Sequence, residues 1–363
     1  MLKALTINDA GSNYIMELSS FELKAHYTNL LHLHVKYFGK ECIKYEPVLS
    51  HGSERLIVRL HSEDGSSSIG IVNRHIDENK AFISFGIHFR NAGLNVPEVY
   101  IVSPGIDSYI LEDLGDETLL KRLSDGKVFN NVKFLLYKKV IDELPKFQVT
   151  AGKEIDYSFC YQYMEFGSEN IDFDLEYFKL RFLGSFYKSV LNHKKLSTDL
   201  LYIKDKILEF PRDYFLYRDF QSRNIMIKND VPYFIDFQSG RKGALLYDMA
   251  SLLYDAKADI PQTMREELLD YYLNSIKDYG IADTDKMHQY FWYFAIVRIL
   301  QAMGAYGFLG IVKGKRKFLE SIPYAIRNIN FILENRTNKD ELLYLKTIFN
   351  ELLKESKADN DKA

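Results

Sequence analysis

Two aspartates and one asparagine constrain this chain more than any other feature of its sequence. Asp219 follows an apolar run at 214–217, and Asn224 comes after four intervening residues. Asp236 follows a second apolar run at 233–235. Short apolar runs bounded by turn residues are typical of buried strands. The pattern therefore predicts that these polar side chains lie in loops at strand ends.

These residue types match the chemistry of phosphoryl transfer. That reaction needs an acceptor for the proton of a substrate hydroxyl, placed beside oxygen ligands that hold magnesium on the phosphates. The order of Asp, four residues, Asn and then a metal-binding Asp on the next strand is that of a kinase catalytic loop. We therefore predict Asp219 as the base and Asn224 and Asp236 as Mg²⁺ ligands. The simpler alternative is that both carboxylates are ordinary turn residues.

A third segment, the apolar helix predicted at 247–253, favours the catalytic interpretation of Asp219 and Asp236 over that of ordinary turn residues. Asp248 lies at its start, where a carboxylate can accept hydrogen bonds from backbone N–H groups. We therefore expect Asp248 and Arg218, the neighbour of Asp219, to support the catalytic loop structurally.

Composition sets the outer bounds. A chain of 363 residues with 47% hydrophobic and 27% charged residues is typical of a soluble protein with two lobes. A net charge of -3 gives no broad attraction to nucleic acid or to an anionic membrane. Cys42 and Cys160 form neither a disulfide framework nor a metal-ligand spacing. With no signal peptide and no apolar run near eighteen residues, we expect a cytoplasmic protein.

The first third of the chain alternates between helical and strand patterns. Helices are predicted at 20–38 and 78–92, and strands at 56–60, 69–72, 98–103 and 108–111. The turn before the first strand contains Ser50, Gly52 and Ser53, and a small-residue loop of this kind can bring backbone N–H groups to phosphate oxygens. An ordinary hairpin turn is the alternative.

The last predicted strand of this region runs into an abruptly acidic, glycine-bearing segment at 111–116, which includes Glu112, Asp113 and Leu114. In a two-lobed kinase this is the place of the hinge, whose backbone groups can pair with adenine. The alternative is an acidic loop between a strand and a helix.

The remainder is mostly helical. Helices are predicted at 119–123, 132–149, 175–191, 264–279, 288–307, 317–333 and 340–354, with a frayed tail at 356–363. The helix at 288–307 is almost wholly apolar, yet it contains Arg298 and Gln301. These two residues either tie helices together or line a substrate pocket. Gly304 and Gly307 permit close approach by another backbone or by a ligand.

The chain resembles the aminoglycoside-phosphotransferase-like kinase superfamily, and is most similar to the bacterial N-acetylmuramate/N-acetylglucosamine anomeric sugar kinases of cell-wall recycling. The matching segments occur in order between residues 49 and 323. They are 93–98, 111–116, 218–224, 235–238, 247–253, 314–315 and 322–323.

The resemblance implies a fold and a reaction. The fold is α+β and bilobal, like that of protein kinases. A small antiparallel sheet at 1–115 covers ATP, with the helix at 20–38 as an extension, and a mainly helical lobe at 116–355 carries the acceptor pocket. The implied activity is ATP- and Mg²⁺-dependent phosphorylation of the anomeric hydroxyl of an amino sugar in cell-wall sugar salvage. The product would feed a sugar-1-phosphate nucleotidyltransferase.

The chain departs from many kinases at the third strand. The segment 71–74 has no lysine, so phosphate neutralisation falls to Arg74, to Arg55 or mainly to the metal. Tyr217 and Gln238 stand where protein kinases have His and Gly, and these two changes are similar to the sugar-kinase pattern.

Two alternative functions stay open. An aminoglycoside or amino-alcohol (choline-like) kinase would need an acidic pocket, for which Asp172, Asp174 and Glu176 are candidates, although they can equally be a solvated helix start. A nucleotide-binding pseudokinase scaffold would need only the nucleotide pocket. The presence of all three residues Asp219, Asn224 and Asp236 favours an enzyme.

Overall fold

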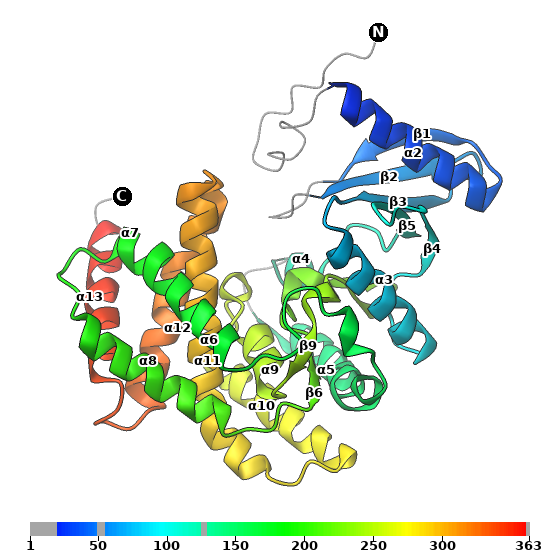
Figure 1. Cartoon of the computed structure of the whole chain (residues 1–363). Helices are drawn as coiled ribbons and strands as arrows, with labels where there is room; N and C mark the ends of the chain where they lie inside the picture. The colour runs from blue at the N-terminus through cyan, green and yellow to red at the C-terminus, as the bar shows by residue number, and fades with distance from the viewer. Residues whose placement is uncertain (1–19, 49–54, 125–128, 361–363) are drawn as a thin grey trace. The chain divides into compact units, whose positions relative to one another are not determined.

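The structure is a computed structural model that describes residues 20–48, 55–124 and 129–360. The chain divides into two units, Met1–Gly115 and Asp116–Ala363, which we call the N-unit and the C-unit. The predicted α+β class is confirmed, because the N-unit contains an antiparallel sheet and the C-unit is mainly helical (Figure 1).

The N-unit is built on a five-stranded antiparallel sheet with the strand order β1-β2-β3-β5-β4. The edge strand β1 is missing from the sequence prediction, because it exposes apolar side chains such as Ile43 and has no clear alternation. The strands are β1 (Cys42–Pro47), β2 (Leu56–Ser62), β3 (Ser67–Val72), β4 (Val99–Val102) and β5 (Ser108–Glu112).

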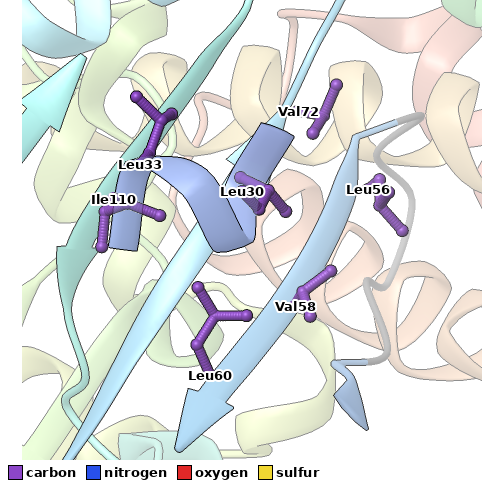
Figure 2. Close-up of a cluster of buried hydrophobic side chains, with 7 residues drawn as sticks. All are labelled: Leu30, Leu33, Leu56, Val58, Leu60, Val72 and Ile110. Carbon is purple, nitrogen blue, oxygen red and sulfur yellow. The ribbon is translucent and has the colours of Figure 1, made fainter. Parts of the chain in front are cut away.

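One hydrophobic cluster joins this sheet to the helix α2, which spans Ser20–Phe38 as predicted. Leu30 and Leu33 of α2 meet side chains from three strands, and all seven members of the cluster are buried (Figure 2). Gly70 on β3 makes room for this packing, since a Cβ atom there would lie 3.0 Å from the Leu30 side chain. The strand members of the cluster are Leu56, Val58, Leu60, Val72 and Ile110.

The second helix of the N-unit, α3, spans Ile76–Asn91. It buries Phe82, Phe85 and Phe89, which recur at three- and four-residue spacing along one helix face. Glu78 lies in its first turn, where a negative charge is favoured by the helix dipole.

The C-unit combines helices with two small antiparallel sheets. β6 (Tyr214–Leu216) pairs with β9 (Arg241–Gly243), and β7 (Ile225–Lys228) pairs with β8 (Val231–Phe234). The helices are α4 (Leu119–Ser124), α5 (Asn131–Pro145), α6 (Ser168–Phe178), α7 (Gly184–Phe186), α8 (His193–Leu208), α9 (Leu246–Leu253), α10 (Gln262–Ser275), α11 (Thr284–Gly307), α12 (Ile322–Asn335) and α13 (Leu343–Asn360).

Three features of this helical region differ from the prediction. α6 begins at Ser168 rather than near Leu175, and α8 was not predicted at all. α13 continues to Asn360, so the tail expected to fray from residue 356 is helical up to that point.

The long helix α11 is the centre of the C-unit core. It contacts α6, α8, α9, α10 and α12 (Figure 1). The close approach predicted at its glycines is made by a backbone, since a Cβ on Gly307 would lie 2.1 Å from the carbonyl oxygen of Arg181.

The expectation that no apolar run approaches eighteen residues is wrong for this helix. The stretch Thr284–Val312 is long and apolar enough to cross a membrane, with a mean hydropathy of 1.6 in its most apolar window. Since 56% of that window is buried inside the protein, the stretch has the character of a core helix.

Candidate active site

The structure brings Asp219, Asn224 and Asp236 together in the C-unit. Asp219 follows β6, Asn224 ends a short 3₁₀ turn before β7, and Asp236 follows β8. The amide nitrogen of Asn224 donates to the carbonyl oxygen of Asp219 at 2.9 Å and to Asp236 Oδ2 at 3.3 Å. The β7–β8 hairpin thus brings Asn224 and Asp236 together, and the Asn224 amide joins them to the loop of Asp219.

The backbone of this loop is conformationally unusual. Arg218 has φ 72° and Asp236 has φ 68°, both in the left-handed region that non-glycine residues rarely adopt. Such conformations cost about 1–3 kcal/mol each and persist only where surrounding contacts fix them.

Asp248 on α9 supplies such contacts. It is completely buried, and it accepts hydrogen bonds from the backbone N–H groups of Tyr217 at 2.9 Å and Arg218 at 2.8 Å. Its third donor is Gln148 Nε2, also at 2.9 Å. Burial raises the pKa of Asp248 to about 7, although the three N–H donors oppose this shift. Asp248 therefore holds the strained residue that precedes Asp219.

The side chain of Arg218 points to α6. It forms an ion pair with Asp174 at 3.3 Å, in which the Asp174 side chain is only 3% exposed. Burial raises the pKa of Asp174, and the Arg218 guanidinium counteracts only part of that increase. This pair ties the catalytic loop to α6, a second structural support beside that of Asp248.

Oxygen donors at this centre suit a hard divalent cation. Both hydrogen bonds that the Asn224 side chain donates come from its amide nitrogen, so its amide oxygen is the atom that it can offer to a cation. Together with the Asp236 carboxylate this makes two oxygen ligands, and Mg²⁺ commonly uses one or two protein ligands and completes its shell with phosphates and water. Within residues 20–48, 55–124 and 129–360 no cluster of three His, Cys, Asp or Glu side chains could hold a metal.

The predicted phosphate-binding residues of the N-unit have different surroundings. Ser50, Gly52 and Ser53 lie outside the described residues. Arg55 forms an ion pair with Glu78 on α3, and its side chain is only 13% exposed. Arg74 is 58% exposed and pairs with Glu22 on α2 at 3.2 Å. The two arginines proposed for the same role are therefore held very differently.

The predicted hinge residues lie at the end of β5 and just beyond it. The Asp113 carboxylate accepts hydrogen bonds from Arg59 Nε at 2.7 Å and from the Ser67 hydroxyl at 2.7 Å. The backbone N–H of Glu112 donates to the carbonyl oxygen of Glu98 at 2.9 Å. The segment Glu112–Leu114 is thus fixed within the N-unit, while its contact with adenine stays a prediction.

The two polar residues of α11 bond to each other and to α9. Arg298 donates through Nη1 to Gln301 at 2.8 Å and through Nε to the Ser251 hydroxyl at 2.9 Å. Ser251 in turn lies 3.5 Å from the carbonyl oxygen of Arg218. Arg298 therefore ties two helices together, and it does so directly behind the catalytic loop.

The three acids expected to attract a cationic acceptor do not form one pocket. Asp172 pairs with Lys204, Glu176 with Lys179 and Asp174 with Arg218. The interpretation of all three as a solvated helix start is also wrong, because Asp174 is buried inside the C-unit.

The model of the phosphotransferase enzyme family matches residues 198–290, a span that includes Asp219, Asn224, Asp236 and Asp248. The N-acetylmuramate/N-acetylglucosamine kinase of Neisseria meningitidis is 26% identical over 266 residues, covering 72% of this chain and 76% of that protein. The protein of the same name from Pseudomonas aeruginosa is 24% identical over 302 residues, covering 82% and 86%.

This chain is a phosphotransferase. Its predicted resemblance to the aminoglycoside-phosphotransferase-like kinases is confirmed, and a kinase of this kind uses ATP to phosphorylate a hydroxyl group.

Solved structures support the fold of this phosphotransferase. Plasmodium vivax ethanolamine kinase has a TM-score of 0.60 and 11% identity, covering 91% of this chain and 98% of that one. A choline/ethanolamine kinase family protein from Mesorhizobium loti has a TM-score of 0.57 and 12% identity, covering 92% and 98%. At these identities the likeness concerns the fold alone.

One residue of the phosphotransferase that the sequence analysis did not single out is Arg241 on β9. It is 1% exposed, and it donates to Asn170 at 2.7 Å and to Gln162 at 3.1 Å. Burial lowers the pKa of Arg241 to about 10, and the nearby Arg218 adds to this effect. Its position five residues after Asp236 was the only indication in the sequence, and it does not reveal the burial.

Proposed function

We propose that this phosphotransferase is an ATP- and Mg²⁺-dependent sugar kinase that phosphorylates the anomeric hydroxyl of an amino sugar of the N-acetylmuramate or N-acetylglucosamine type. The observation that carries the proposal is the Asn224 amide, which bridges the loop of Asp219 and the Asp236 carboxylate. This arrangement combines a proton acceptor with two oxygen ligands, as phosphoryl transfer requires.

The residues have separate roles in the proposed reaction. Asp219 orients the sugar hydroxyl and accepts its proton. Asn224 and Asp236 would hold Mg²⁺, which neutralises charge on the phosphate oxygens when it is bound. Asp248 and Arg218 keep the loop in its strained conformation, so that Asp219 is positioned before the substrate arrives.

The paired state of the acids on α6 and the names of the relatives favour an amino sugar over a cationic acceptor. The nearby carboxylate Asp174 is already paired, and Arg218, Arg241 and Arg298 all act on it electrostatically. Asp172 and Glu176 are paired with lysines as well, so the acids of α6 offer no shared pocket to a cationic antibiotic or to choline. N-acetylmuramate carries a carboxylate, and the relatives from Neisseria meningitidis and Pseudomonas aeruginosa are named for it and for N-acetylglucosamine.

The proposed product also suggests a metabolic context. A sugar phosphorylated at its anomeric position is a substrate for a nucleotidyltransferase that makes sugar nucleotides. We therefore propose a role in cytoplasmic cell-wall sugar salvage, coupled to such an enzyme.

The test is an acceptor panel. Purified protein with ATP and Mg²⁺ is offered free amino sugars, aminoglycosides and choline-like alcohols, and the phosphorylated position is determined by phosphorus NMR. We expect an anomeric phosphate on an N-acetylated sugar. Turnover of only a cationic acceptor would replace the proposal with the aminoglycoside or amino-alcohol kinase, and ATP binding without any turnover would favour the scaffold.

A variant of the predicted base, Asp219, provides a second test. Asp219→Asn should reduce turnover at least about a hundredfold, because general-base contributions are typically that large. The variant should still bind Mg²⁺ and ATP, as measured by calorimetry. Turnover close to that of the unchanged protein would remove Asp219 from the proposed role.

A further inference from the structure

We infer that Arg55, held by Glu78, binds the phosphate groups of ATP in place of the strand lysine that this chain lacks. The inference rests on the proposed use of ATP, and it selects Arg55 over Arg74.

The strand register brings Arg55 to the end of β3. In the antiparallel pair of β2 and β3, Leu56 lies opposite Val72. Arg55 precedes Leu56 and Asn73 follows Val72, so the two residues meet at the same end of the two strands. A side chain just before β2 can therefore reach the position where many kinases have a lysine on the third strand.

Glu78 connects this end of the sheet to α3. One of its carboxylate oxygens, Oε1, pairs with Arg55 Nη2, and the other, Oε2, accepts a hydrogen bond from Asn73 Nδ2 at 2.9 Å. In kinases the strand lysine pairs with a glutamate on the corresponding helix. Here the same kind of glutamate has an arginine from the neighbouring strand as its partner.

The start of α3 is fixed, so Glu78 is a firm anchor for the guanidinium. Asn79, the next residue, donates from Nδ2 to the carbonyl oxygens of Asn73 at 2.8 Å and Ile106 at 2.7 Å. The Glu78 side chain is 17% exposed. Although burial opposes it, the Arg55 guanidinium lowers the pKa of Glu78, and the pair is ionised at neutral pH.

The chemistry of the guanidinium suits this role. It is planar and always charged, and its five N–H donors allow it to contact a phosphate group while a carboxylate holds it in place. Its fork matches the spacing of phosphate oxygens. The ion pair of Arg74 with Glu22 is more exposed, at 58% and 47% of the two side chains, and ion pairs exposed to this degree contribute little.

A nucleotide series tests the inference. Binding of adenosine, AMP, ADP and ATP is measured by calorimetry in the presence of Mg²⁺ and without acceptor. For Arg55→Gln we expect roughly a tenfold or larger loss of ATP affinity, because a charge-assisted contact is lost. Adenosine should bind nearly as before, whereas a merely structural pair would affect all four ligands alike.

Arg59→Gln is the matched control. Arg59 forms a similarly buried ion pair with Asp113 in the same sheet, and its loss should change the affinity for all four ligands by a similar factor. Arg55→Lys, which keeps the charge, should recover part of the ATP affinity and serves as the second variant if Arg55→Gln does not fold.

Two results would overturn the inference. One is equal loss, or no loss, across the series for Arg55→Gln, and the other is a phosphate-dependent loss for Arg74→Gln instead. These measurements contain no sugar. The proposed acceptor can therefore fail in the turnover panel while the role of Arg55 stands, and the reverse also holds.

Discussion

The N-unit and the C-unit treat their inward-facing carboxylates in opposite ways. In the N-unit, Glu78 and Asp113 each face an arginine, and the pKa of each is lowered although burial acts against this. In the C-unit, Asp174 and Asp248 are buried more deeply, and burial raises the pKa of each. For the two N-unit acids, arginines and hydrogen bonds outweigh the effect of burial on the pKa, whereas burial outweighs the Arg218 ion pair of Asp174 and the three N–H donors of Asp248.

The two kinds of contact respond differently to the loss of one partner. The acidic side chains of the two N-unit pairs are 17% and 7% exposed, so they keep some access to water, and a charge that loses its partner can be partly resolvated. A buried carboxylate that satisfies several N–H donors has no such substitute, and its removal leaves all of those donors unpaired. The backbone of the catalytic loop depends on the second kind of contact.

Among these substitutions, Asp248→Ala should have the largest effect on stability. It leaves the N–H groups of Tyr217 and Arg218 and the Gln148 amide without their acceptor, and we expect a loss of about 3–5 kcal/mol in C-unit stability. Trp292 is the only tryptophan of the chain, so its fluorescence in a urea titration reports on this unit.

The control for that experiment is Asp172→Ala. Asp172 belongs to an ion pair in which its side chain is 55% exposed, and its loss should change stability by less than about 1 kcal/mol. Equal effects of the two substitutions would break the contrast between buried and exposed carboxylates.

Gly307→Ala probes the dry packing of the C-unit without changing any charge. Its new methyl group would meet the carbonyl oxygen of Arg181 at 2.1 Å, and we expect a destabilisation of about 1–3 kcal/mol in the same titration. Gly184→Ala is the matched control, because its nearest atom would be 3.7 Å away. If Gly307→Ala left the stability unchanged, α11 and the segment before α7 would be able to move apart.

The pH dependence of the C-unit should sharpen the contrast further. Because the pKa of Asp248 is raised to about 7, its contribution is fully present below pH 4 and is lost as pH rises through 7. The stability advantage of the unchanged protein over Asp248→Asn should therefore shrink by roughly 1–3 kcal/mol between pH 5 and pH 8. An advantage that grows over this interval would contradict the raised pKa.

Glu78→Gln should have the smallest effect, about 1 kcal/mol or less, because a partly exposed pair is lost. The pH dependence of stability has the opposite direction to that of Asp248. Because the pKa of Glu78 is lowered in the folded protein, its contribution to stability is present above the pKa of the unfolded state and is lost as pH falls through the pKa of the folded state. Hydrogen exchange at α3 should show faster exchange in the variant at pH 7, with a smaller difference in acid. A difference in exchange rate between the two proteins that increases in acid would contradict the lowered pKa of Glu78.

The features of this structure that depend on residues close together in the chain could be predicted from the sequence. The boundaries of α2 follow from apolar side chains at helical spacing, and the loop of Asp219, Asn224 and Asp236 follows from their order between two apolar runs. α8 was missed although Leu196, Leu200, Ile203 and Ile207 have the same helical spacing.

Other features had no local indication. The ion pairs of Arg55 with Glu78 and of Arg218 with Asp174 join residues that are distant in sequence, so no periodicity reveals them. The burial of Asp174 is likewise decided by α11 and the catalytic loop, both far away along the chain. Sequence patterns report which residues share a face, but not which faces meet.

The central position of α11 also has a consequence for biosynthesis. The helix contacts α6 and α9, which precede it on the ribosome, and α12, which is made only afterwards. A nascent chain that ends near residue 312 therefore displays an almost wholly apolar helix with one side uncovered. We expect such a truncated product to aggregate or to be retained by chaperones, and the C-unit core to close only after α12 has left the exit tunnel.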